Sequence, residues 1–236
     1  GRIPASIAGI VGWGLLLAGI ALAAFAGMGS LALPCIALVI AVLTVLYNGL
    51  HTRTAFSIVF LAASRGLLYP LGAMSCAPLN AFDSAGTLLI VLVAGAAFVH
   101  TIALSLVARG EADQESHAPA LTLGFGTIAL AIPGGMAVVM MLTLLGTHKH
   151  AEVWPLPGIS AACTLFFLLA WLARDLRNLM GTTPATTRFV LGSIAAFCLY
   201  DASIVALLPS PYFLFALIPL ALFLVVNLAH RSIHGT

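Results

Sequence analysis

The stretch GSLALPCIALVIAVLTVLY at residues 29–47 contains no charged side chain. An α-helix rises about 1.5 Å per residue, so about 20 apolar residues cross the hydrocarbon core of a bilayer. Backbone polar groups in lipid have to be satisfied within the segment itself, which makes a helix the default structure. The stretch therefore predicts a transmembrane helix.

The composition extends this prediction to the whole chain. Of its 236 residues, 62% are hydrophobic and only 7% are charged, whereas soluble domains carry about 25% charged residues. The net charge of +2 comes without a basic stripe, so we expect no nucleic-acid partner. We expect an integral membrane protein, surrounded by membrane lipids and folded as a single transmembrane helical domain over residues 1–236.

Hydropathy along the chain predicts about eight spans, and the expected fold is therefore all-α, a polytopic transmembrane helical bundle. Their approximate bounds are 6–27, 29–47, 54–75, 84–108, 118–146, 156–174, 186–207 and 210–229. Pro133, Gly134 and Gly135 fall inside the fifth span and predict a kink or a break there.

The basic residues give the orientation. With eight spans, one side of the membrane carries seven arginines and the other carries only Lys149. The seven are Arg2, Arg53, Arg109, Arg174, Arg177, Arg188 and Arg231. Because cytoplasmic loops are enriched in basic residues, we expect both ends in the cytoplasm, with a bacterial inner membrane as the location. The run RDLRNL at 174–179 then predicts a basic helix end near anionic headgroups.

Three ionisable residues fall inside predicted spans: Arg65, His100 and Asp201. Such groups are costly in lipid and usually face the bundle interior or a cavity. Arg65 either binds an anion such as a diphosphate or pairs with Asp201 or with helix carbonyls. Asp201 and His100 are each either functional or interior packing partners. The chain contains no GxSxG, Walker A, HExxH or CxxCH sequence, so the corresponding hydrolase, NTPase, metalloprotease and haem sites are not indicated.

Four stretches together resemble the UbiA-like intramembrane prenyltransferase superfamily, and most closely its divergent EboC-type branch. They are GRI at 1–3, LYNGLHTRTAFSIVFLAASRGLLYPLGA at 46–73, LSLVARGEA at 104–112 and FCLYDASIVAL at 197–207. The resemblance implies a helical bundle with a cavity open to the cytoplasm. It also implies transfer of a prenyl group from a prenyl diphosphate to a lipophilic acceptor.

The superfamily binds Mg²⁺ and the diphosphate through two aspartate-rich motifs. The resemblance implies that two helices and the first motif lie upstream of Gly1, and that the second motif falls in the loop VARGEADQESH at 107–117. There the usual D-x-x-x-D is replaced by Glu111 and Glu115, which share one face if the loop is helical. Carboxylates are hard oxygen ligands that suit Mg²⁺. Glu111 and Glu115 are thus the expected catalytic and metal-binding residues, with Asp113 facing away.

The resemblance assigns substrate contacts to five further residues. They are Arg65, Arg109, Asp201, Asn48 and Arg53. The alternative interpretation of the acidic stretch at 107–117 is a solvated, partly helical cytoplasmic loop with no ligand.

Two other functions stay open. A non-catalytic UbiA-like accessory subunit would pack against other membrane subunits through Gly- and Ala-rich faces. A small-solute transporter would use the interrupted fifth span together with buried Arg65 and Asp201.

Overall fold

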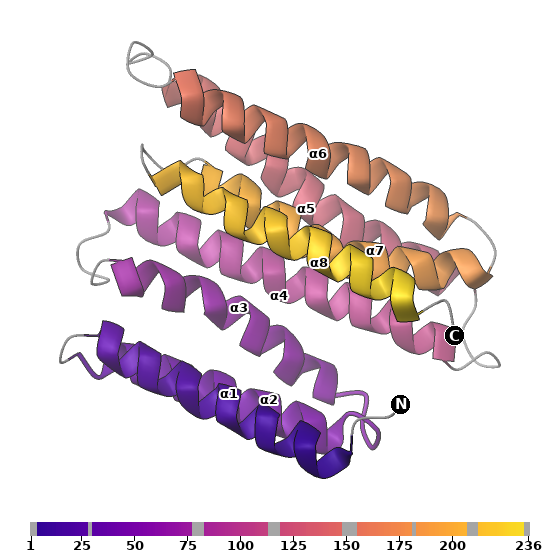
Figure 1. Cartoon of the computed structure of the whole chain (residues 1–236). Coiled ribbons are helices and arrows are strands. Elements are labelled where there is room, and N and C mark those ends of the chain that lie inside the picture. Colours follow the sequence, from indigo (N-terminus) through magenta and orange to yellow (C-terminus); the bar gives the residue numbers. More distant parts are fainter. Residues whose placement is uncertain are drawn as a thin grey trace. The chain divides into compact units, whose positions relative to one another are not determined.

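The computed structural model describes residues 4–27, 30–76, 83–112, 119–147, 155–180, 183–206 and 212–233. Within these ranges the chain forms eight α-helices, one 3₁₀ helix and no strand (Figure 1). The elements are α1 (Ala5–Ala26), α2 (Ala32–Leu50), α3 (Ser57–Cys76), α4 (Ser84–Ala112), α5 (Pro119–Thr147), α6 (Pro155–Leu179), α7 (Thr183–Ala206), η3 (Tyr212–Ala216) and α8 (Leu217–Ile233). The expected all-helical fold is confirmed.

Six of these helices contain a stretch long and apolar enough to cross a membrane. The stretches are Gly9–Ala26, Ala32–Leu50, Ser57–Cys76, Gly86–Arg109, Ile159–Asn178 and Arg188–Ala206. Two shorter apolar stretches, Leu123–Met136 and Leu214–Leu228, lie in α5 and in η3 with α8. The chain is therefore an integral membrane protein, and spans five and eight of the predicted eight stay predictions.

The outer surface of the helices is apolar. Phe25 is 84% exposed and Ile10 is 73% exposed, although soluble monomers rarely expose large contiguous apolar patches. Several hydroxyl groups, in contrast, donate to carbonyls of their own helices: Thr101 Oγ1 donates to the Ala97 carbonyl at 2.7 Å and Ser203 Oγ to the Leu199 carbonyl at 2.8 Å. Both features suit helices that are surrounded by lipid.

The chain divides into two compact units, Gly1–Ile102 and Ala103–Thr236. In the first unit, α1 and α2 share a buried cluster of Ala23, Leu33 and Ala37. Also in this unit, α3 approaches α4 so closely that a Cβ on Gly66 would lie 3.0 Å from the Ala94 carbonyl oxygen. Each unit thus has its own packed interior. The prediction of a single domain stays a prediction.

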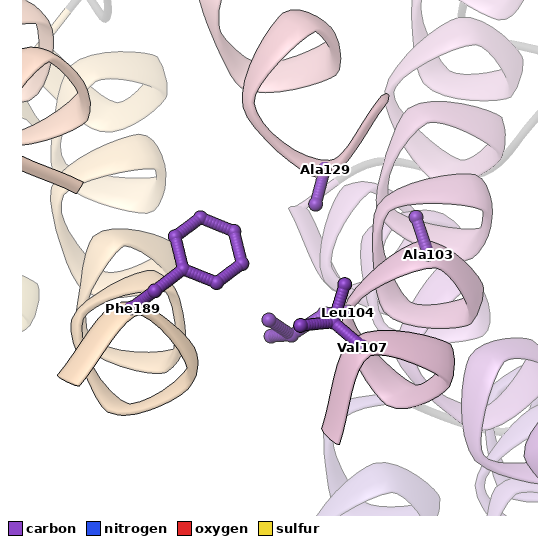
Figure 2. Close-up of a cluster of buried hydrophobic side chains, with 5 residues drawn as sticks. All are labelled: Ala103, Leu104, Val107, Ala129 and Phe189. Atoms are coloured by element: carbon purple, nitrogen blue, oxygen red, sulfur yellow. The ribbon is translucent and has the colours of Figure 1, made fainter. Parts of the chain in front are cut away.

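In the second unit, Phe189 of α7 packs against the end of α4 and the middle of α5. Its ring is fully buried and points toward Leu104 and Val107, with Ala129 alongside (Figure 2). The α5 helix continues through the buried Pro133 without a break, and the predicted kink at this proline stays a prediction. At Gly134, α5 faces α6 at ordinary packing distance, since an added Cβ would lie 3.9 Å from Leu172 Cδ1.

The helices α6 and α7 form an antiparallel pair with a regular register. Ala161 and Ala206 share one buried cluster, and Leu168 and Leu199 share the next. One further step of seven residues along each helix brings Asp175 to Gly192. A seven-residue spacing of inward-facing residues is the geometry of coiled-coil packing. The seam between α6 and α7 therefore ends on a carboxyl group.

Candidate functional site

Asp175 is the carboxyl at the end of this seam, and it is 0% exposed. It lies directly against the backbone of Gly192 in α7, where an added Cβ would lie 2.8 Å from Oδ2 and 2.9 Å from Cγ. Real Cβ atoms essentially never come this close to other heavy atoms. Glycine at position 192 is thus required for α6 and α7 to approach each other around Asp175.

The hydrogen bonding of this carboxyl is incomplete. Ser193 Oγ donates to Oδ2 over a long 3.4 Å, and Oδ1 has no hydrogen-bond partner. The Asn178 side chain lies beside the same carboxyl, yet its Nδ2 is buried and completes no hydrogen bond. A buried polar group left unsatisfied costs about 1–3 kcal/mol. Packing against Gly192, more than hydrogen bonding, keeps Asp175 in place.

Trp171 lies one turn before Asp175 and contacts two other helices. Its Nε1 donates to the Gly192 carbonyl at 2.9 Å, and its ring meets Phe223 of α8 edge-on at 4.7 Å between centroids. The Arg174 guanidinium lies over the same ring, with Cζ 4.1 Å from the centroid. Aromatic and cation–π contacts of this kind stabilise by about 0.5–1.5 kcal/mol each. Trp171 thus joins α6, α7 and α8 and orients Arg174.

The cluster around Asp175 is not a substrate site in this conformation. A side chain that is 0% exposed cannot reach a substrate dissolved in water or lipid. The sequence indicated only the basic helix end at 174–179. The inward orientation of Asp175 went unrecognised, although the spacing of seven from Ala161 through Leu168 to Asp175 was an available signal.

Three predicted substrate-binding residues lie in the first unit. Asn48 is exposed in the last turn of α2, and its backbone carbonyl accepts a hydrogen bond from His51 Nδ1 at 2.9 Å. Arg53 is exposed in the turn that follows, where its backbone N–H donates to the Leu50 carbonyl at 2.9 Å. Arg65 is exposed on α3, eight residues after the helix begins at Ser57. Asn48 and Arg53 are thus close in sequence, on either side of the end of α2 at Leu50.

The other predicted site residues lie in the second unit. Arg109 is half-buried near the end of α4, and Asp201 is half-buried in α7. Glu111 lies in the last turn of α4, whereas Asp113 and Glu115 are outside the described residues. The predicted pairing of Glu111 with Glu115 therefore stays a prediction, as does the pairing of Arg65 with Asp201. His100, in the first unit, is buried in α4 as expected for an interior histidine.

The described part of the chain contains no group of three or more His, Cys, Asp or Glu side chains that would bind a metal. Mg²⁺ often uses only one or two carboxylates together with substrate phosphates, so this observation does not decide the Mg²⁺ prediction. Glu111 carries a carboxylate, which is a type of oxygen ligand that Mg²⁺ accepts.

No family model, curated protein or solved structure matches this chain. The resemblance to the UbiA-like superfamily accordingly rests on the residues quoted above. The helical membrane fold is compatible with it.

Proposed function

We propose that this chain acts as a UbiA-like membrane prenyltransferase, which transfers a prenyl group from a prenyl diphosphate to a lipophilic acceptor. The observation that carries the proposal is the position of Glu111. The apolar span of α4 ends at Arg109, and the helix continues to Ala112. Glu111 is thus within one turn of the membrane boundary. A prenyl diphosphate has its charged head at that boundary and its chain in the lipid.

The order of the spans relates the turn between α2 and α3 to the end of α4. When α1 to α4 each cross the membrane once, the ends of α2 and α4 emerge on the same side, because two crossings separate them. Asn48 and Arg53 then share a membrane side with Arg109 and Glu111. By the excess of arginines on that side we place it in the cytoplasm of a bacterial cell.

The proposed reaction breaks the bond between the prenyl carbon and the diphosphate oxygen, and joins that carbon to the acceptor. Negative charge accumulates on the leaving diphosphate, so positive groups around it stabilise the transition state. Arg53, Arg65 and Arg109 would supply positive charge and hydrogen-bond donors. Glu111 and Glu115 would hold Mg²⁺, which when bound adds further positive charge beside the phosphates.

The test is transfer of radiolabelled geranylgeranyl diphosphate to lipophilic acceptors in membranes that contain the whole gene product. Glu111→Gln and Glu115→Gln should each lower kcat/KM by at least about 10- to 100-fold, as is usual for groups at a metal site. Asp83→Asn is the matched control, since it removes an acid at the opposite end of α4. Asp83 Oδ1 caps this helix by accepting the Gly86 N–H at 2.7 Å, and Asn caps equally well.

Equal rates for wild type, Glu111→Gln and Glu115→Gln would show that the two glutamates have no such role. An inactive whole gene product, tested across prenyl donors of several lengths, would contradict the enzymatic proposal itself.

A non-catalytic accessory subunit is the second candidate, favoured by the surface of α1. Only 6% of its span is buried, and a Cβ on Gly9, Gly12 or Gly19 would meet nothing within 4 Å. Small residues let membrane helices approach closely. Co-purification of a second membrane protein, abolished by Gly12→Leu, would favour this candidate over the enzyme.

A further inference from the structure

We propose that Arg174, Arg177 and Arg188 form a binding site for the phosphate group of an anionic membrane lipid. All three side chains are exposed, and all belong to the hairpin of α6 and α7. This site is separate from the residues in the proposed prenyl transfer, so each proposal is tested without the other.

The three arginines lie within about 8 Å of one another in depth, because five residues of helix at about 1.5 Å each separate Arg174 from the level of Arg188. The register that brings Asp175 to Gly192 places Arg174 level with Ser193 and Arg188 level with Leu179 of α6. The apolar span of α6 ends at Asn178, and that of α7 begins at Arg188. Since both spans stop at this level, the guanidinium groups lie where the hydrocarbon of the bilayer meets the headgroups.

The charge at this end of the hairpin is positive. Between Trp171 and Ser193 the sequence contains these three arginines and one acid, Asp175, which leaves a net charge of +2 when all four are ionised. Asp175 is fully buried, so it presents no negative surface to a ligand. The exposed charges at the hairpin end are therefore all positive, with the buried Asp175 carboxyl next to Arg174.

Arg174 is oriented before any ligand binds. Its guanidinium stacks on Trp171, whose indole is fixed by the hydrogen bond to Gly192 and the contact with Phe223. Stacking uses the face of a guanidinium and leaves its in-plane N–H donors available, which is the arrangement that binds phosphate oxygens. Such preorganisation lowers the entropy cost of binding.

The neighbouring side chains favour a lipid over a phosphate in solution. On the face of α6 that carries Arg174 and Arg177, the apolar residues Ala173, Ala170, Phe167 and Phe166 are exposed, the two phenylalanines at 60% and 69%. They extend from the level of the arginines toward the middle of the span. A molecule whose phosphate contacts the arginines can therefore lay acyl chains along α6.

The test titrates dioleoyl phosphatidylglycerol into the full chain in neutral detergent and counts bound lipids by native mass spectrometry. The triple variant R174Q/R177Q/R188Q should bind on the order of 100-fold more weakly, at about fivefold per arginine. Arg231→Gln, which removes one positive charge near the end of α8, is the control and should retain wild-type affinity. Trp171→Phe should weaken binding about two- to fivefold with all three arginines present.

Two further arms identify the ligand class. Dioleoyl phosphatidylcholine, which has no net charge, should bind much more weakly than phosphatidylglycerol, and inorganic phosphate should not displace the bound phosphatidylglycerol. Equal affinity of wild type and the triple variant, or full displacement by phosphate, would overturn the proposal. Should the triple variant fail to fold, each of the single variants R174Q, R177Q and R188Q should still bind phosphatidylglycerol more weakly than the wild type and Arg231→Gln.

Discussion

Gly192 is the residue on which the α6–α7 pair depends. Its missing side chain provides the space in which the Asp175 carboxyl lies, and its carbonyl accepts the Trp171 indole N–H. A polar residue on a helix seam stabilises one register over the neighbouring ones, because any other register leaves it in an apolar environment. Asp175 and Gly192 together thus specify how α6 and α7 are aligned.

Gly192→Ala should lower the free energy of unfolding by about 1–3 kcal/mol, because the new methyl group overlaps the carboxyl. Reversible unfolding in mixed detergent micelles measures this change. Gly124→Ala in α5 is the control, since a Cβ there meets nothing within 4 Å, and it should be neutral or slightly stabilising.

The double variant Asp175→Ala, Gly192→Ala locates the cause of this loss. When the carboxyl is removed, the alanine at position 192 should cost much less than it does alone, which gives a coupling energy of about 1 kcal/mol or more. Additive effects of the two substitutions would mean that the overlap is not what limits position 192.

At the scale of the element, α6 has an inner face and a lipid face, and we expect substitutions on the inner face to lower the free energy of unfolding more. Trp171→Ala should cost about 3–5 kcal/mol, the usual loss for a large aromatic at a packed contact, because it removes contacts with both α7 and α8. Phe166→Ala on the same helix should cost less than about 1 kcal/mol. Phe166 is 69% exposed, and lipid replaces its surroundings in both states.

Unfolding of both variants in the same mixed micelles provides the measurement. A loss at Phe166 as large as that at Trp171 would show that the exposed face of α6 is covered by protein and not by lipid.

Hydropathy predicted the positions of the helices well, but it placed the ends of some helices too early in the sequence. The sixth span was expected at 156–174, whereas α6 continues to Leu179. Charged residues end an apolar run, yet they do not end a helix, because the backbone hydrogen bonds continue through Arg174 and Arg177. The same reason explains why α4 passes the expected end at 108 and reaches Ala112.

The Asp175 cluster was harder to predict than the helices. Its partner Gly192 is distant in sequence and has no side chain whose chemistry would indicate a contact with a carboxyl group. The orientation of Asp175 depends on the register of two helices, and a shift of one residue would turn it about 100° around the helix axis. Glu111, in contrast, was placed near a span end by hydropathy alone, since its position depends only on the length of α4.

At the scale of the whole molecule, the order of spans predicts which segments share a side of the membrane. Thr52→Cys, after α2, and Gly110→Cys, near the end of α4, should react from the same side with a membrane-impermeant maleimide. Native Cys76, exposed at the end of α3, should react from the opposite side. Each cysteine is tested alone, with the other native cysteines replaced by alanine, in right-side-out and inverted vesicles.

Reaction of Thr52→Cys and Gly110→Cys from opposite sides would contradict four consecutive crossings by α1 to α4. It would also put Arg53 and Glu111 on opposite sides of the membrane, which would contradict their joint role in the proposed prenyl transfer.

The buried carboxyl of α6 also constrains how the protein is inserted into the membrane during its synthesis. Before α7 is made, Asp175 lies near the membrane boundary at the end of α6 with no helix to cover it, and moving its carboxylate deeper into lipid would be costly. The covering surface is the backbone of Gly192, which the ribosome makes only after the connection to α7. We therefore expect α6 to reach its final depth only when α7 pairs with it, so that the α6–α7 hairpin inserts as one unit.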